Sequence, residues 1–421
     1  MKEIAVDVLV VGGGVQGLMV LRDLSRLGYS VLLLETSKLG GGQTCHSHVL
    51  IHQGHLCRKP SLASEFKEGF ELWRGLLATR FGGGNEIDVV IGFDDEVDAI
   101  EQQSIWGAVN PPIQCARRPA PPEFGVSRLK RTFGTSVIAL TSDQIVETLV
   151  EGLTAITAKI DRPEHFRVKG RSIEEVTVDF PTQPSARIKP GAVVLAAGAG
   201  NQALLDLLSE RASGAQRNRK APVLVVSGDG QMDLPRIGGF FVIRGNGISI
   251  APREHDGRVV WLISDSRILI NASGEQAFIG WFRSLLADLQ QLAPALFGFP
   301  QKLRWALHMA DKSEGGGAYR WPYSGRIEQF GIDNLWTVWP TFLTLAPLLS
   351  RRVCDGITLR LPRKGAARMS EEPFWQVPQR SAEYWQRHSH PDNLQAWESF
   401  SKHFGGDGDP EVGENDYVGG S

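Results

Sequence analysis

The chain has 421 residues, of which 42% are hydrophobic and 22% are charged, and 45 basic against 47 acidic residues give a formal net charge of −2. This composition is globular, lacks the basic surplus of a nucleic-acid binder, and at this length favours two lobes over one core. The glycine-rich N-terminus is not typical of a signal peptide, and residues 335–349 are too short and too polar to span a bilayer, so we expect a cytoplasmic protein. Four cysteines without CxxC spacing exclude a secreted disulfide scaffold and argue against a zinc site.

The first 35 residues contain a complete βαβ pattern. Residues 5–11 are mostly apolar and β-branched, which is typical of a buried strand, and residues 15–27 carry apolar side chains at helical spacing. Gly28 is a natural end for this helix, and residues 30–34 form a second apolar strand. The whole pattern has the length of about thirty residues that a βαβ unit requires.

The rest of the chain alternates between helical and strand-like segments. We expect helices at residues 61–81, 142–156, 275–292 and 343–353, and strands at residues 88–93, 97–100, 167–169, 177–180, 192–197, 223–226, 240–243, 259–263 and 335–338. This order predicts a nucleotide-binding domain at residues 1–80, 140–210 and 315–365, interrupted by a mostly β substrate domain at residues 81–139 and 211–314. Residues 366–404 are expected to form a helical extension, and the acidic, glycine-rich residues 405–421 a disordered tail.

A GxGxxG motif connects the first strand to the first helix. Its glycines, Gly12, Gly14 and Gly17, permit a tight turn, the approach of a pyrophosphate to the backbone, and close helix–strand packing. Glu35, at the end of the second strand, is placed to accept hydrogen bonds from ribose hydroxyls. We therefore expect a dinucleotide, FAD or NAD, to contact Gly12, Gly14, Val15, Gln16, Gly17 and Glu35.

Residues 40–54, GGGQTCHSHVLIHQG, resemble the flavin-proximal segment of FAD-dependent oxidoreductases of the D-amino acid oxidase superfamily. The pattern is most similar to the L-2-hydroxyglutarate and glycerol-3-phosphate dehydrogenase branches, and its matching positions are Gln43, Thr44, His46, Ser47, Ile51, His52 and Gly54. Residues 193–201, VVLAAGAGN, resemble the family's strand and turn beside the dinucleotide, and residues 334–353 resemble its closing strand and helix.

The resemblance implies an α/β protein in which a Rossmann-like FAD-binding domain holds an inserted, mainly antiparallel β-sheet substrate domain. Beyond the phosphate loop, the implied FAD contacts are Gln43, Thr44, His46, Ser47, Val168, Ala197, Gly198, Thr341, Phe342, Leu343 and Thr344. The implied enzyme is an oxidase or dehydrogenase that removes a hydride from the amine- or hydroxyl-bearing carbon of a small anionic amino or hydroxy acid, with oxygen or a quinone as electron acceptor. One departure is the closing loop, where Trp339, Pro340, Thr341 and Phe342 stand in place of a usual glycine pair.

Two histidines are candidates for the proton acceptor that an alcohol substrate needs as its hydride leaves. Neutral imidazole suits this role near pH 7. We expect His52 to act in the site, with His46 as an alternative base or as a covalent tether to the flavin, and with His308 as a weaker candidate. His48 and His55 complete a group of four nearby imidazoles, but no carboxylate or thiolate stands at a supporting spacing, so no metal is expected.

An arginine is expected to hold the anionic group of the substrate, because a guanidinium makes two parallel charge-assisted bonds. Arg320 is favoured over Arg253 and Arg326, because it lies between a glycine run and the aromatic residues Trp321 and Tyr323.

Two other functions remain open. A flavin-dependent monooxygenase or halogenase also begins with GxGxxG, but it carries a Gly-Asp motif beside its closing helix, and residues 338–347 contain none. The other alternative is a protein that binds FAD without catalysing a reaction, and only the altered closing loop supports it.

Overall fold

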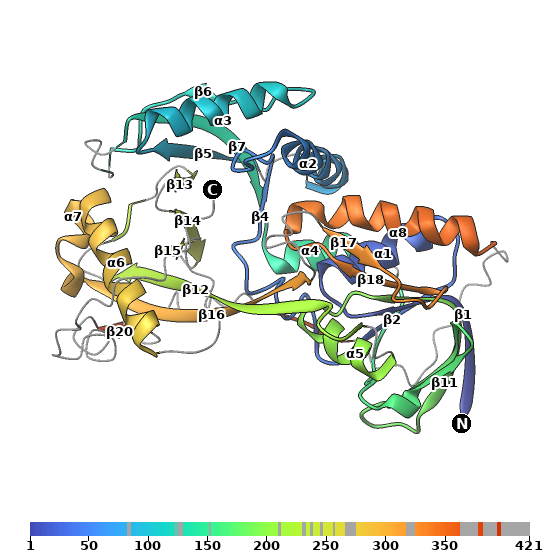
Figure 1. Cartoon of the computed structure of the whole chain (residues 1–421). Helices are drawn as coiled ribbons and strands as arrows, with labels where there is room; N and C mark the ends of the chain where they lie inside the picture. The colour runs from blue at the N-terminus through green and yellow to red at the C-terminus, as the bar shows by residue number, and fades with distance from the viewer. Residues whose placement is uncertain are drawn as a thin grey trace.

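The computed structural model describes residues 1–81, 86–122, 124, 129–150, 153–208, 212–229, 233–235, 239–244, 247–255, 257–265, 275–316, 325–362, 378–381 and 394–396. Within these residues the strands form two large sheets and one short pair, and helices cover the large sheets. The two large sheets lie side by side, and the chain passes between them several times (Figure 1).

The first sheet has eight strands among the described residues and is mainly parallel. Its strands are β1 (Lys2–Val11), β2 (Val31–Glu35), β8 (Ala155–Thr157), β9 (Phe166–Lys169), β10 (Ser172–Val178), β11 (Ala186–Leu195), β17 (Arg326–Glu328) and β18 (Leu335–Trp339). The main path runs β17–β18–β11–β1–β2–β8, in which β1, β2, β8, β11 and β18 pair in parallel. The carboxyl ends of these strands therefore meet at one edge of the sheet, where ligands of such folds bind.

Helices cover both faces of the first sheet because its strands are apolar on both sides. One face, which includes Val8 and Val10, packs against α1 (Val15–Arg26), α4 (Ser142–Val150) and α8 (Ala346–Arg360). The opposite face, which includes Leu9 and Leu32, packs against α5 (Asn201–Leu208).

The second sheet has ten strands among the described residues and is mainly antiparallel. Its strands are β4 (Leu50–His52), β5 (Glu86–Phe93), β6 (Ala116–Arg117), β7 (Arg131–Ala139), β12 (Gln216–Gly228), β13 (Gly239–Arg244), β14 (Ile248–His255), β15 (Arg258–Asp265), β16 (Leu303–Gly315) and β20 (Gln395–Ala396). The order is β20–β16–β12–β15–β14–β13–β5–β7–β4, and only β13 and β5 pair in parallel along this path. The long strands β12 and β16 pair along their full length and reach from this sheet towards the first one (Figure 1).

The two faces of the second sheet have separate cores. One contains Trp261 and Trp305 and is covered by α6 (Glu275–Leu292) and α7 (Pro294–Phe297). The other contains Val225 and Leu262 and packs against α3 (Glu96–Ala108) and the first turns of α2 (Pro60–Phe81). A third, two-stranded sheet joins β3 (Lys38–Leu39) to β19 (Gln379–Arg380) in parallel.

The structure confirms the expected fold class, a parallel α/β core joined to a mainly antiparallel sheet, but it corrects two expected elements. Residues 97–100 belong to helix α3 and not to a strand, and the helix expected at residues 142–156 ends at Val150 and is followed by strand β8. Strand β4 joins the second sheet although it lies within residues 1–80.

Most of the expected C-terminal extension and tail lies outside the described residues, namely residues 366–377, 382–393 and 397–421. The described parts of residues 366–404 contain the short strands β19 and β20. Among the described residues, no helix combines the length and the apolar character that crossing a bilayer requires. All four cysteines are described, and none of them forms a disulfide.

Candidate functional site

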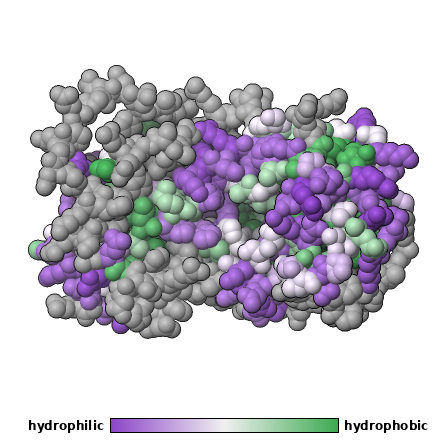
Figure 2. Space-filling model, turned by 90° about the horizontal axis from the view of Figure 1, so that it is seen from below, coloured by the Kyte–Doolittle hydropathy of each residue, from purple (hydrophilic) through white to green (hydrophobic). Residues whose placement is uncertain are grey.

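A cavity of about 2340 Å³ lies where the carboxyl edge of the first sheet faces the second sheet. It is larger than the roughly 300–1,000 Å³ of most small-molecule pockets, so it has room for a dinucleotide and a further ligand. Its walls include the GxGxxG turn, Glu35, the turn after β11, residues 41–52, and parts of β16 and of the closing segment. In the view from below, a hollow lies near the centre between the two halves of the molecule (Figure 2).

The GxGxxG turn is packed so closely that two of its positions accept only glycine. Gly12 has a φ of +111°, and a Cβ there would lie 2.6 Å from the carbonyl oxygen of Ala196. A Cβ on Gly17 would lie 1.8 Å from the carbonyl oxygen of Gly12. By contrast, a Cβ on Gly14 would meet only the Thr44 hydroxyl at 3.4 Å. Gly14 therefore leaves open the space that a pyrophosphate would fill.

The N-terminus of α1 is suited to an anion. Its N-cap residue, Gly14, has no side chain to cap it, and its first turn holds no acidic residue. The Val15 N–H donates to the Thr44 hydroxyl at 3.1 Å, which brings the 43–47 loop against the helix end. The partial positive charge of the helix end thus faces the cavity without a protein anion of the first turn to offset it.

Glu35 is held at the edge of the same groove. One of its carboxylate oxygens accepts from the Gly13 N–H at 2.7 Å, and the other accepts from the Ser37 N–H at 2.8 Å. A carboxylate fixed in this way keeps acceptor capacity for ribose hydroxyls, as the sequence predicts.

The far end of the groove is apolar and differs in part from the expectation. Ala197 and Gly198 line it as expected, together with Ala203, Leu204 and Leu207 after them and Ala158 and Ile160 from the segment after β8. Val168 does not line the described cavity, because it lies on β9 with 39% of its surface exposed. The sequence did not predict that Ala158 and Ile160 line the groove, because residues of β8 were assigned to the helix expected at residues 142–156. Once that strand is recognised, its carboxyl end is a natural ligand position.

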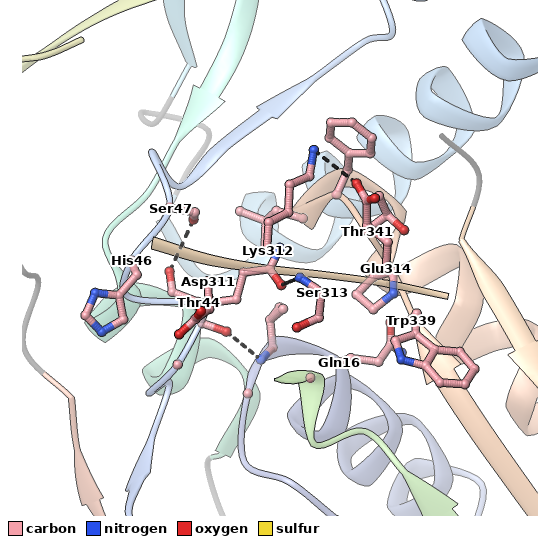
Figure 3. Close-up of a pocket in the computed structure, with 18 of the residues that line it drawn as sticks. Gln16, Thr44, His46, Ser47, Asp311, Lys312, Ser313, Glu314, Trp339 and Thr341 are labelled. Atoms are coloured by element: carbon pink, nitrogen blue, oxygen red, sulfur yellow. Dashed lines mark hydrogen bonds and ion pairs between the residues drawn. The ribbon is translucent and has the colours of Figure 1, made fainter. Parts of the chain in front are cut away.

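The loop with the flavin-type sequence is fastened to β16. The Gln43 side-chain oxygen accepts from the Ser313 N–H at 3.2 Å. The Ser47 hydroxyl donates to the Thr44 carbonyl at 3.3 Å (Figure 3). Gln43 and Ser47 both line the cavity, so their expected proximity to a cofactor is compatible with these bonds. Their observed bonds show that they also hold the loop in place.

The structure brings His46 and His308 together. The Nδ1 atom of His46 lies 2.7 Å from the Nε2 atom of His308, and the two rings are stacked with an interplanar angle of 7°. His46 lines the cavity, and His308, which does not line it, contacts His46 from β16. A proton must occupy the short space between the two nitrogens, so the pair acts as one hydrogen-bonded unit.

His52 has a different environment from His46. Its ring stacks on Phe66 at 4.7 Å and meets the edge of Phe342, and burial lowers its pKa to about 4. Its Nδ1 atom accepts from the Gly54 N–H at 3.2 Å. The neutral ring therefore carries its proton on Nε2, which makes His52 a hydrogen-bond donor to the cavity and a weak base.

His48 and His55 are buried beside the same loop. Burial and then the nearby Arg253 lower the pKa of His48 to about 3, and burial keeps the pKa of His55 well below its usual range. These histidines do not gather into a metal site in the described part of the chain. The one metal-like group found there, Asp161, His165 and Asp179, surrounds the guanidinium of Arg162, which already supplies the cation.

The closing segment adopts the backbone that glycine usually supplies. Thr341 has a φ of +59°, a left-handed conformation that costs a β-branched residue energy. Its hydroxyl is buried and has no protein partner among the described residues. Phe342 and Leu343 line the cavity beside it. The Thr344 hydroxyl accepts from the His52 N–H at 3.1 Å.

The closing helix α8 is preceded by a 3-10 turn, η6 (Leu343–Leu345), and no side chain caps it. Its first turn contains no acidic residue. The orphaned Thr341 hydroxyl and this uncapped helix end fit the polar edge of a flavin ring.

Of the three arginines considered for binding the substrate anion, Arg253 and Arg326 are described, and neither lines the cavity. Arg320, Trp321 and Tyr323 lie outside the described residues. Arg253 donates to the carbonyl of His48, and Arg326 forms an ion pair with Glu328.

Sequence reasoning missed Lys312 and Glu314, which project from β16 into the cavity (Figure 3). Lys312 Nζ lies 3.4 Å from Glu314 Oε1, and Glu314 also pairs with Arg219 of β12. Burial, followed by the nearby Arg219, lowers the pKa of Lys312. The alternation of a strand places residues 312 and 314 on one face, but only the structure shows which face meets the cavity.

Comparison with known proteins finds one matching family profile and a similar oxidoreductase. Residues 7–133 match the profile of the DAO family, described as FAD dependent oxidoreductase. The probable FAD-dependent oxidoreductase PA4991 of Pseudomonas aeruginosa is 26% identical over 89% of this chain and 99% of its own. Its crystal structure superimposes with a TM-score of 0.68 at 23% identity, covering 93% of this chain and 100% of that one.

Two further solved structures share the fold. L-proline dehydrogenase from P. horikoshii has a TM-score of 0.66 at 16% identity, covering 86% of this chain and 96% of its own. Glycine oxidase from Geobacillus kaustophilus has a TM-score of 0.60 at 16% identity, covering 87% and 100%. Together with the cavity described above, these findings support an FAD-dependent oxidoreductase whose residues 7–133 match the DAO family.

Proposed function

We propose that this oxidoreductase removes a hydride from the amine- or hydroxyl-bearing carbon of a small anionic substrate, with an amino acid as the first class to test. The observation that carries the proposal is the buried cluster of Arg219, Lys312 and Glu314 at the cavity wall. When bound, FAD supplies the hydride acceptor; the residues described here bind the substrate and move its proton.

The charge of this cluster favours an anionic ligand. Arg219 and Glu314 are 5% and 4% exposed, and Lys312 is largely buried, so both cations lie beside the Glu314 carboxylate and are largely shielded from water. A cation in a medium of low dielectric constant is stabilised by a nearby anion, and Lys312 is the cation of this cluster that lines the cavity. A substrate carboxylate next to Lys312 would supply that anion, and it would raise the lysine pKa back towards its usual value.

The names of similar proteins support an amino acid. Proline dehydrogenase, glycine oxidase and L-amino acid deaminase from Proteus vulgaris are among the similar solved structures. A hydroxy acid, which the sequence pattern also implies, fits the same proposal, because amino acids and hydroxy acids both carry a carboxylate that Lys312 would bind.

His46 is the better-placed proton acceptor. Its ring lines the cavity and its Nδ1 atom is engaged by His308, so Nε2 is the nitrogen that can take a proton from the substrate. His52, with a pKa of about 4, suits hydrogen-bond donation to a substrate or cofactor oxygen. Oxygen or a quinone would then accept the electrons.

The two other functions have little structural support. Thr341 adopts the left-handed backbone that a glycine would provide, so the altered closing loop no longer argues for a protein without turnover. We find no observation in the described residues that favours monooxygenation or halogenation over hydride removal.

The test compares Lys312→Met with Lys312→Arg, and uses the exposed Lys220→Met of β12 as the control. Glu314 keeps Arg219 as its partner in every variant, so each should fold and retain FAD. Bleaching of the flavin is followed without oxygen, with a panel of amino and hydroxy acids as substrates. The kcat/KM of Lys312→Met should be at least about tenfold below that of the wild type. Wild-type bleaching by that variant would overturn the role of the cluster.

A further inference from the structure

The cavity continues beyond the proposed reaction centre into a space between two helices. We name this space the α2–α3 arm, and it is lined by Leu56, Leu62, Phe66, Gln102 and Ile105. Leu62 and Phe66 are four residues apart on α2, and Gln102 and Ile105 are three apart on α3, so each pair lies on one helix face. The arm therefore has one wall from each helix.

Hydrogen bonds fix the two walls relative to each other. The Gln102 side-chain nitrogen donates to the carbonyl of Cys57 at 3.0 Å, and the Trp106 indole donates to the carbonyl of His55 at 3.0 Å. Gln102 and Trp106 are buried, and both bonds tie α3 to the segment that leads into α2. The space between the helices is thus a built feature of the fold.

Phe342 connects the arm to Lys312. The Lys312 ammonium lies 4.8 Å from the centre of the Phe342 ring, and the Phe342 ring lies 5.1 Å from that of Phe66. Leu62 lies one helical turn before Phe66 on α2. A ligand whose carboxylate meets Lys312 can therefore extend past Phe342 and Phe66 into the arm.

The polarity of the arm changes along its length. Its inner walls carry partly buried apolar side chains, Leu56, Leu62 and Ile105, which pack against the adjoining core and also line the cavity. Its outer rim is charged: Arg58, Lys59 and Glu101 are exposed, and Arg58 lies 3.6 Å from Asp98. Apolar walls inside a charged rim suit an apolar group that has left water.

We infer that the α2–α3 arm receives the apolar side chain of the substrate, so that the enzyme prefers amino or hydroxy acids with large apolar side chains over those with small ones. The inference rests on the proposed function, because Lys312 fixes the end of the ligand from which the side chain extends. Beyond the proposed function, the inference specifies the size and polarity of the substrate side chain.

Unreactive carboxylates test the inference without turnover. The FAD-loaded protein is titrated with acetate, butanoate and hexanoate, and binding is followed by the change in the flavin absorption spectrum. Each methylene that enters the arm should lower Kd about fourfold. Leu62→Trp and Ile105→Trp fill the arm, and Ile100→Trp is the matched control, since Ile100 lies on α3 with 49% of its surface exposed.

Both arm variants should bind acetate as the wild type does, within about twofold, and should lose at least about tenfold in affinity for hexanoate, whereas the control should lose neither. Equal Kd values for the three acids in the wild type would overturn the arm while leaving the carboxylate site intact. Unchanged hexanoate binding in both filled variants would overturn it too. Failure of all three acids to bind would refute the carboxylate site at Lys312, and the inference with it.

Discussion

The Nδ1 atom of His46 lies 2.7 Å from the Nε2 atom of His308, although 262 positions separate the two residues in sequence. For Nε2 of His46 to accept a proton from the substrate, Nδ1 must carry a hydrogen and donate it to His308. The acceptor on β16 then stabilises the protonated form of His46. This arrangement makes His308 a positioning residue that acts through His46.

His308→Phe should keep the stacked ring but remove the acceptor nitrogen. We expect kcat to fall about tenfold with little change in KM, and the acid limb of the kcat/KM profile to move to lower pH, because protonated His46 loses its partner. His52→Gln is the comparison, and it should retain the wild-type acid limb. A loss of that limb in His52→Gln, with no shift in His308→Phe, would return the role of base to His52.

Gly14→Val should give a folded protein without FAD. A Cβ at Gly14 meets only the Thr44 hydroxyl at 3.4 Å, so the polypeptide can accommodate the side chain, but the side chain occupies the space of the pyrophosphate. The purified variant should be colourless, with the circular dichroism of the FAD-free wild type. Gly75→Ala, at an open position on α2, is the control and should purify yellow. A fully yellow Gly14→Val would refute this phosphate site.

Thr341→Val and Thr344→Val should change stability in opposite directions in the FAD-free protein. Valine has the shape of threonine, so each change removes only a hydroxyl. The Thr341 hydroxyl is buried without a protein partner among the described residues, and its removal should raise the free energy of unfolding by about 1–3 kcal/mol. The Thr344 hydroxyl accepts from the His52 N–H, and its removal should lower that free energy by a similar amount.

Urea unfolding of both variants measures these changes. If the Thr341 hydroxyl binds the flavin, Thr341→Val should also weaken FAD binding, as measured by fluorescence of the released flavin. Destabilisation of the FAD-free Thr341→Val protein would show that its hydroxyl has a partner.

Acid should destabilise the protein before its carboxylates titrate. Burial lowers the pKa of His48 to about 3 and that of His52 to about 4, from an ordinary value of 6.5. Between about pH 6.5 and pH 4 these histidines are protonated in the unfolded chain but remain neutral in the folded protein. Their contribution to the free energy of unfolding is therefore lost as the pH falls. The melting temperature should drop between about pH 7.5 and pH 5, and the drop should be smaller in His48→Gln. Equal drops in both proteins would contradict the buried, neutral His48.

The phosphate loop could be predicted from sequence because its constraints are local. Gly12, Gly17 and Glu35 all lie in one βαβ unit, and the structure shows the contacts that require them. Helix α3 was predicted as a strand because Val97 and Ile100 stand out, yet they are exposed. Its buried residues include the polar Gln102, which interrupts the apolar helical pattern.

The substrate side of the cavity could not be predicted, because it depends on pairing between distant strands. Lys312 and Arg219 reach the same place only through the register of β12 with β16, which pairs these two residues directly. Nothing in the local sequence of residues 303–315 shows which face of the strand will meet the cavity, since apolar and charged residues occur on both. The link between His46 and His308 has the same origin.

The strand order of the first sheet has a consequence for how the protein is made. Strand β11 lies between β1 and β18, and about 140 residues separate Leu195 from Leu335, so at bacterial or eukaryotic synthesis rates roughly 7 to 28 s pass between the synthesis of β11 and that of β18. During that time one edge of β11 lacks its neighbour near the carboxyl end, and α8 is missing from the face that it covers. A nascent chain shorter than about 340 residues therefore lacks a complete flavin cradle. We therefore expect cofactor capture only late in synthesis or after it, and shortage of flavin in the cell should reduce the yield of the enzyme by leaving full-length but empty chains to proteolysis.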